Sequence, residues 1–364
     1  MTVGGTTLGE QESTNAALEG EQLSSGRTLV LVAGSGRSGT SLFTGILQRL
    51  GFHVPQPEVP ADETNPRGFA ESQWVVDFHT RLLKKAAVQV SDARPTAWAR
   101  VAELTLDSQL GEELRTWLGA QFKEAHHLIV KDPRLSWFLP LWRRCAQELA
   151  VSPRCATVLR HPAAVVDSKQ RFYGDWQSDV SRTAGWLNQA LFTERATRDF
   201  PRVFVRYEDL LDDWTSSVAR VGNQLQLQLI QDAPAPAIVG VHDFVDLSLS
   251  RSRATWDDFE IPSGLREQVD HVWELLSRFV EGETGGPALL EEFDAARAAY
   301  ITLYGDAEAI AQSSIVASWS SAANGSTFLK VAGRVPRPLR NRLPLSWRRA
   351  AYRAAHGRGA RRPG

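Results

Sequence analysis

The chain has 364 residues, of which 43% are hydrophobic and 23% are charged, and its formal net charge is −1. This composition is typical of a soluble globular protein that is long enough to bury a large core. It excludes a membrane-spanning protein, because no hydrophobic stretch approaches the roughly 20 apolar residues that a transmembrane helix needs. Cys145 and Cys155 are the only cysteines and form no C-x-x-C pair, so a disulfide framework or a structural zinc site would have little to be built from.

Residues 1–26 are polar, contain four glutamates and show neither helical nor alternating periodicity. This pattern predicts a disordered leader. The segment also lacks the basic start and the apolar run of a secretory signal, so we expect a cytoplasmic protein.

From residue 27 onward, short apolar runs alternate with longer amphipathic segments. The strand candidates are Thr28–Ala33, His127–Val130, Cys155–Leu159 and Val203–Arg206. Because short and almost uniformly apolar strands suit a parallel sheet covered on both faces, we predict an α/β fold of three layers. One domain would occupy residues 27–312, with helices at 263–281 and 286–304 near its end.

A glycine-rich turn follows the first predicted strand, with the sequence Gly34-Ser35-Gly36-Arg37-Ser38-Gly39-Thr40-Ser41. Glycines let successive backbone N–H groups converge, and the helix that follows adds partial positive charge, so the turn predicts an anion-binding loop. Gly34, Gly39 and Ser41 fit the P-loop pattern, but Thr40 stands where ATP- and GTP-binding loops have lysine. The positive side chain is Arg37, three places earlier.

Charged residues also follow or end the later predicted strands. Lys131, Asp132 and Arg134 follow the second strand, and we expect Asp132 and Arg134 to pair with each other or to cap the next helix. Arg160 follows the third strand, and Ser168 lies on the helix after it. An arginine at a strand end and a serine facing it can together hold a phosphate, which predicts a second anion site.

These motifs, in this order, resemble those of sulfotransferases that use 3′-phosphoadenosine 5′-phosphosulfate (PAPS), particularly the bacterial and heparan-type branches with a P-loop-like fold. The resemblance covers most of residues 27–312. It implies that Arg160 and Ser168 hold the 3′-phosphate and that Tyr207 lies near the adenine. It also implies that the 5′-phosphosulfate is held, without a metal ion, by Gly36, Arg37, Ser38, Gly39, Thr40 and Ser41.

Sulfuryl transfer requires a base, because a neutral alcohol is a weak nucleophile that loses its proton as the bond to sulfur forms. The resemblance implies Glu71, which precedes a predicted amphipathic helix, as this base. Glu58, Glu63 and His79 remain alternatives. Lys131 would stabilise the charge that develops on the leaving phosphate oxygen, together with Arg37. The product would be adenosine 3′,5′-bisphosphate (PAP).

The C-terminal part of the chain is basic. Residues 330–364 carry one lysine, ten arginines and no acidic residue, and Ser313–Ser326 is rich in serine and alanine, which predicts a linker and a basic tail over residues 313–364. Such a tail can lie on the inner surface of an anionic membrane or pack on its own domain. Arg251 and Arg253 are candidates for a late clamp on the 3′-phosphate.

The sequence does not select the acceptor, for which a glycolipid, a carbohydrate and a secondary metabolite are all suitable hydroxyl carriers. We expect no nucleic-acid partner, because no recognised nucleic-acid module accompanies the basic tail. A homodimer remains open. Two other functions remain open as well: a P-loop kinase using ATP and magnesium, against which the missing lysine argues, and a catalytically inert scaffold.

Overall fold

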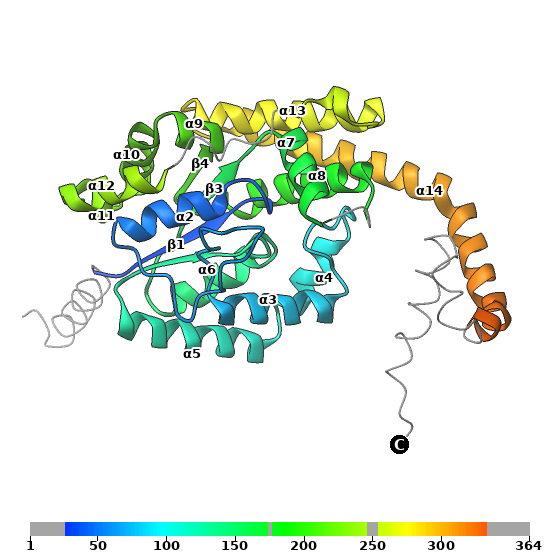
Figure 1. The fold of residues 1–364 in the computed structure, drawn as a ribbon, viewed down its shortest axis with the longest axis horizontal. Helices are drawn as coiled ribbons and strands as arrows, with labels where there is room; N and C mark the ends of the chain where they lie inside the picture. The colour runs from blue at the N-terminus through cyan, green and yellow to red at the C-terminus, as the bar shows by residue number, and fades with distance from the viewer. Residues whose placement is uncertain (1–25, 174–176, 246–253, 333–364) are drawn as a thin grey trace, which may run out of the picture. The chain divides into compact units, whose positions relative to one another are not determined.

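The computed structural model describes residues 26–173, 177–245 and 254–332 (Figure 1). The chain divides into two compact units, residues 1–301 and 302–364. The predictions for the leader, for Arg251 and Arg253, and for the basic tail beyond residue 332 lie outside the described residues.

In the first unit, each described strand is followed by two or more described helices. In chain order they are β1 (Thr28–Ala33), α2 (Thr40–Arg49), α3 (Gln73–Ala86), α4 (Ala97–Leu104), α5 (Ser108–Glu124), β2 (His127–Lys131), η1 (Leu135–Phe138), α6 (Leu139–Glu148), β3 (Arg154–Leu159), α7 (Pro162–Tyr173), α8 (Asp179–Ala196), β4 (Arg202–Arg206), α9 (Tyr207–Asp212), α10 (Trp214–Gln224), α11 (Gln228–Gln231), α12 (Ala235–Phe244), η3 (Trp256–Asp258), α13 (Ser263–Val280) and α14 (Pro287–Ala332).

The four described strands form one parallel sheet in the order β2-β1-β3-β4. The predicted α/β fold with a helix-flanked parallel sheet is therefore confirmed. Each strand matches its predicted range to within one residue at either end. The prediction succeeds because the strands are buried on both faces, and their sequences are correspondingly apolar at almost every position.

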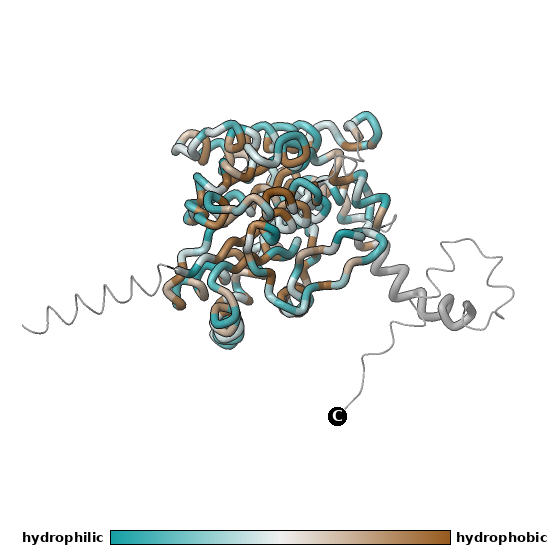
Figure 2. Tube along the Cα trace, turned by 60° about the vertical axis from the view of Figure 1, so that its left-hand side comes forward, coloured by the Kyte–Doolittle hydropathy of each residue, from teal (hydrophilic) through white to brown (hydrophobic). Residues whose placement is uncertain are grey.

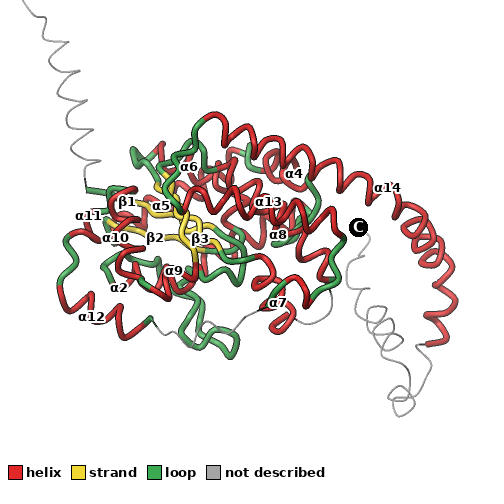
Figure 3. The backbone as a smooth tube through the Cα atoms, turned by 90° about the horizontal axis from the view of Figure 1, so that it is seen from above, coloured by secondary structure: helices red, strands yellow, loops and turns green. Residues whose placement is uncertain are grey.

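The sheet separates two hydrophobic clusters. On one face, Leu29, Leu31 and Ala33 of β1 pack with residues of α3, α4, α5, η1 and α6. On the other face, Val30 and Val32 pack with residues of α2, α9, α10 and α12. Figure 3 shows the strands in yellow between the helices, and Figure 2 shows the apolar segments gathered inside the first unit.

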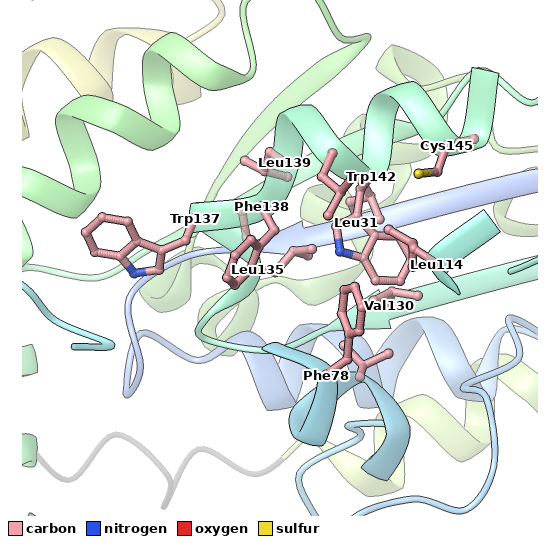
Figure 4. Packing of buried hydrophobic residues seen from close by; sticks show 14 of the residues in the cluster. Leu31, Phe78, Leu114, Val130, Leu135, Trp137, Phe138, Leu139, Trp142 and Cys145 are labelled. Atoms are coloured by element: carbon pink, nitrogen blue, oxygen red, sulfur yellow. The ribbon is translucent and has the colours of Figure 1, made fainter. Parts of the chain in front are cut away.

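Aromatic side chains fill the first of these clusters (Figure 4). Trp137, Phe138 and Trp142 are almost completely buried in this cluster, which also contains Leu31 and Val130 of the sheet. Rings of this size bury much apolar area each, so η1 and α6 are held firmly against the strand that ends at the candidate site.

The C-terminal helix departs from the prediction. The expected helix at 286–304 is the beginning of α14, but α14 continues to Ala332 through the segment 313–326 that we predicted as a linker. The helix can continue because residues 306–324 contain neither glycine nor proline and several alanines, the strongest helix formers. The boundary between the two units lies at residues 301 and 302, earlier than the predicted domain end at 312.

No described helix offers the uninterrupted apolar length that crossing a bilayer would take.

The packing of α2 yields a stability prediction. Phe43 is fully buried between α2 and the sheet. We expect Phe43→Ala to lower the free energy of unfolding by about 3–5 kcal/mol, because it removes a buried ring and leaves a cavity. Leu106, which is 76% exposed, provides the control: Leu106→Ala should change stability by less than about 0.5 kcal/mol. Urea denaturation measures both, and equal losses would contradict this account of the core.

Candidate functional site

The carboxyl ends of the strands meet at one edge of the sheet. β1 lies between β2 and β3. The connection after β1 therefore leads to a strand on one side of β1, and the connection after β2 leads to a strand on the other side. In open parallel sheets, ligands bind at such a switch point. The residues at or just after the four strand ends are Gly34, Lys131, Arg160 and Tyr207.

The glycine turn has a backbone conformation that favours glycine at two of its positions. Gly34, Arg37 and Gly39 have positive φ angles of 143°, 75° and 92°. A Cβ atom on Gly34 would lie 2.6 Å from the carbonyl oxygen of Val158, and one on Gly39 would lie 2.1 Å from the ring of Tyr207. Both positions therefore require glycine, and the turn is packed directly against β3 and the residue after β4.

A cavity of about 530 Å³ lies at this edge of the sheet. It is bounded by the glycine turn, the segment from Thr64 to Glu71, the end of β2 and the last turns of α7. All but one of the predicted site residues line it: Gly36, Arg37, Gly39, Thr40, Ser41, Glu71, Lys131, Arg160, Ser168 and Tyr207.

Ser38 is the predicted site residue that does not line the cavity. Its hydroxyl is buried and donates a hydrogen bond to the Ser35 carbonyl at 2.7 Å, and its backbone N–H donates to the same oxygen at 3.1 Å. The Ser38 side chain thus closes the turn from within. Of the other loop residues, Gly36, Arg37, Gly39, Thr40 and Ser41 line the cavity, whereas Gly34 and Ser35 do not.

Arg37, Arg160 and Ser168 form a single cluster. The Nε of Arg37 donates to the Ser168 hydroxyl at 3.0 Å, and Arg160 donates to the Arg37 carbonyl at 3.1 Å. The Arg160 guanidinium also lies over the Tyr207 ring, 4.6 Å from its centre. The residues predicted to form two separate anion sites are therefore contiguous in the structure.

Carboxylates lie near the two arginines of this cluster without forming close ion pairs: Glu208 interacts electrostatically with Arg160, and Asp62 with Arg37. Among the described residues, neither Arg37 nor Arg160 has a carboxylate within ion-pair distance, and the Nε of Arg160 is buried without a hydrogen-bond partner. Burial lowers the pKa of Arg37, and nearby Arg160 lowers it further while Tyr173 opposes the shift. Two neighbouring cations of this kind are typical of a site that receives an anion.

Glu71 and Lys131 meet in the cavity wall. The Lys131 ammonium donates to a Glu71 carboxylate oxygen at 2.5 Å, to the Ser41 hydroxyl at 2.9 Å and to the Phe69 carbonyl at 3.2 Å. Both charged side chains are buried. Burial raises the pKa of Glu71, and the adjacent Lys131 opposes this shift. A carboxylate with a raised pKa is suited to accept a proton near neutral pH.

The three alternative bases lie outside the residues that line the cavity. Glu58 accepts hydrogen bonds from Gln48 and Gln56, and Glu63 is exposed to solvent. His79 is fully buried in the hydrophobic core behind the end of β2. Glu71 is thus the one candidate base of the four that faces the cavity.

His79 belongs to a buried hydrogen-bonded chain. The Trp142 indole N–H donates to Nε2 of His79 at 2.9 Å, so the imidazole carries its proton on Nδ1, which lies 2.7 Å from Asp132. Burial lowers the pKa of His79 and favours this neutral form. Asp132 accepts from the Arg134 guanidinium at 2.7 Å, as the sequence predicts. These hydrogen-bonded side chains therefore hold the Arg134 side chain at the cavity wall.

Several further side chains line the cavity that the sequence analysis did not single out. They are Arg67, Arg171, Phe172, Tyr173 and Phe244. Arg171 lies three residues after Ser168 on α7, a spacing that places both on the same face of a helix, so helical periodicity could have revealed it. No comparable signal identifies Phe244, which reaches the cavity from the end of α12.

Neither a protein-family model nor a curated protein sequence matches the chain. Among solved structures, the chain is similar to the sulfotransferase domain of the Synechococcus PCC 7002 olefin synthase, with 18% identity, a TM-score of 0.42, and coverage of 69% of this chain and 94% of that one. It is also similar to the sulfotransferase domain from the curacin biosynthetic pathway, with 13% identity, a TM-score of 0.41, and coverage of 69% and 98%. TM-scores this low assign neither a family nor a function.

The contact between the turn and Tyr207 can be tested by a double-mutant cycle. We expect Gly39→Ala to lower the free energy of unfolding by at least about 2 kcal/mol, because the new methyl group meets the Tyr207 ring at a positive φ. In a Tyr207→Ala background the clash is gone, and the same substitution should cost about 1–2 kcal/mol.

Gly240 gives the matched control. It lies within α12 with no atom near the position of an added Cβ, so Gly240→Ala should raise stability by about 0.5–1 kcal/mol. Urea denaturation of all four variants supplies the values. A cost of Gly39→Ala that is the same with and without the tyrosine ring would show that the two residues do not touch.

Proposed function

We propose that the chain is a sulfotransferase that binds PAPS in this cavity and transfers its sulfuryl group to a hydroxyl-bearing acceptor. The observation that carries the proposal is the pair formed by Arg37, in the glycine turn, and Arg160 beside it. Neither has a carboxylate within ion-pair distance among the described residues. Neighbouring cations that make no close ion pair are stabilised when an anion joins them. PAPS offers anionic groups at both its 5′ and 3′ positions.

The donors left over in the cluster support this ligand. The buried Nε of Arg160 has no partner among the described residues, so it is available to a phosphate oxygen. The Ser168 hydroxyl accepts from Arg37 and retains its own proton to donate. Backbone N–H groups at the start of α2 add partial positive charge to the same place.

In the proposed reaction, Glu71 accepts the proton of the acceptor hydroxyl as the acceptor oxygen forms its bond to sulfur. The bond between sulfur and the 5′-phosphate oxygen breaks, and PAP leaves with the electron pair of that bond. Lys131 would stabilise the negative charge on the leaving oxygen. No step in this scheme requires a metal ion.

The Glu71–Lys131 contact supports these two roles. Lys131 contacts Ser41 at the start of α2 as well as Glu71, so a single ammonium links the donor loop to the proposed base. Positioning of this kind supplies much of the rate in related group transfers. The ammonium also opposes the rise that burial causes in the pKa of Glu71.

For the acceptor we propose a glycolipid, a carbohydrate or a secondary metabolite. Aromatic side chains line part of the cavity, and Phe172 and Tyr173 remain 38% and 53% exposed there. Exposed aromatic rings at the mouth of a cavity can stack on a sugar, an aryl group or a lipid chain.

Nucleotide preference provides the first test. In isothermal titration, PAP should bind more tightly than ATP with magnesium. The cluster of Arg37, Arg160 and Ser168 supplies donors for the 3′-phosphate, which PAP has and ATP lacks. Arg160→Gln should weaken PAP binding by at least about tenfold, the loss expected for a charge-assisted hydrogen bond. Arg100, exposed on α4, is the control, and Arg100→Gln should leave the affinity unchanged.

Tighter binding of ATP with magnesium would favour a kinase instead. PAP binding without PAP release from PAPS, over a panel of phenol, sugar and glycolipid acceptors, would favour an inert scaffold.

The proposed base provides the second test. With any acceptor that supports PAP release, Glu71→Gln should lower kcat by about 10²–10⁴-fold while PAP affinity is retained. Because the base must be ionised, the rate of the unaltered protein should rise with pH through the raised pKa of Glu71 and then level off. The rate of Glu71→Gln should lack this rise.

Glu63→Gln is the matched control, since Glu63 carries the same side chain outside the cavity lining. It should leave both the rate and its pH profile unchanged. A large loss in Glu63→Gln with full activity in Glu71→Gln would exchange the roles of the two residues. Liquid chromatography of released PAP measures each rate.

A further inference from the structure

A buried lysine lies directly behind the glycine turn. Lys169 follows Ser168 on α7, but while Ser168 lines the cavity, the Lys169 side chain does not. Its ammonium donates to the Ser35 hydroxyl at 3.1 Å and to the Ser91 hydroxyl at 2.8 Å. The residue is 5% exposed. Two consecutive residues of α7 therefore hold the turn, one at Arg37 and the other at Ser35.

The charge of Lys169 has no counter-charge among the described residues. Its two partners are neutral hydroxyls. Two acidic residues beside its neighbours are engaged elsewhere: Asp92, next to Ser91, pairs with Arg94 at 2.6 Å, and Asp179 pairs with Arg182 of α8 at 2.7 Å. Burial lowers the pKa of Lys169 to about 8, and Arg182 lowers it in addition.

Such an arrangement is costly unless something offsets the charge. A buried ammonium without a carboxylate is destabilised by the loss of its hydration. Arg37, which lies in the glycine turn together with Ser35, adds a further cation. The group that could compensate this charge from the other side of the turn is an anion seated in the cavity, separated from Lys169 by the turn itself. The low dielectric of the interior strengthens an attraction over this distance.

We propose that Lys169 is a positioning residue of the donor site, whose protonated form holds the turn through Ser35 and is required for tight binding of the donor, so that the nucleotide binds together with a proton. This inference rests on the proposed function, because it takes the nucleotide's phosphate to be the anion in the turn. It adds a residue behind the cavity wall to those that face the ligand.

The direction in which affinity for the nucleotide changes with pH follows from the protonation of Lys169. Near pH 7 most free molecules carry a protonated Lys169, and as the pH rises through about 8 this fraction falls. A bound anion favours the protonated form and raises the pKa of the ammonium. Binding above pH 8 therefore draws a proton from solution, and affinity declines with rising pH.

Isothermal titration with PAP can measure this uptake. At pH 8.5 the phosphates of PAP are fully ionised, since their second pKa lies near 6, so the ligand contributes no proton change. Titrations in buffers of different ionisation enthalpy should show uptake of between about half a proton and one proton per PAP bound. The Kd should be about tenfold higher at pH 9 than at pH 7.

Two substitutions at Lys169 separate charge from shape. Lys169→Met should show no proton uptake and weak binding at both pH values. Lys169→Arg, which stays protonated throughout, should bind equally at pH 7 and pH 9 without uptake. Lys123→Met, at an exposed position on α5, should behave as the unaltered protein. Thermal melting should confirm that Lys169→Met is folded, since it removes a buried charge.

Three results would contradict the proposal in distinguishable ways. Equal proton uptake in the unaltered protein and in Lys169→Met would assign the linkage to another group. If the PAP affinity of the unaltered protein does not depend on pH, and Lys169→Met lowers it by the same factor at pH 7 and pH 9, Lys169 would make only a structural contact with Ser35. Absence of any PAP binding by the folded, unaltered protein at pH 7 would reject the proposed function itself.

Discussion

An excess of positive charge at the carboxyl end of the sheet is the constraint around which the site is built. Arg37 is held by the positive φ of the turn and Arg160 by the end of β3. The Arg160 side chain contacts the Arg37 carbonyl, and the Arg37 side chain reaches Ser168 on the helix after β3. Cations would normally avoid such proximity, so the fold must hold them there. The rigid sheet, buried on both faces, supplies that force, and an incoming anion would relieve the repulsion.

The fold and much of the cavity wall could be predicted from the sequence because their signals are local. Apolar strands, a glycine turn and charged residues at strand ends each occupy a few consecutive positions. In a parallel sheet, the carboxyl ends of neighbouring strands meet at one edge, so Lys131, Arg160 and Tyr207 converge although they are far apart in the chain. The order of the strands thus brings motifs that are separate in the sequence together around one cavity.

What the sequence could not reveal depends on side-chain direction and long-range packing. Ser38 lies in the turn motif, but its hydroxyl points back to Ser35, and nothing in the pattern distinguishes it from Ser41. His79 falls within reach of the predicted base along the chain, yet α3 turns it into the core. The two predicted anion sites proved contiguous because Arg37 bends toward Ser168, a contact across 131 positions. The extension of α14 was missed because serine and alanine suit both a linker and a helix.

The buried chain from Trp142 through His79 to Asp132 also limits how this protein can diverge. Each member satisfies the polar atom of the next, and all three are shielded from water. Replacing one alone would strand its neighbour's donor or acceptor in the interior. Related sequences should therefore retain all three residues or exchange them as a group for apolar ones, and in the second case Arg134 would have to find another anchor.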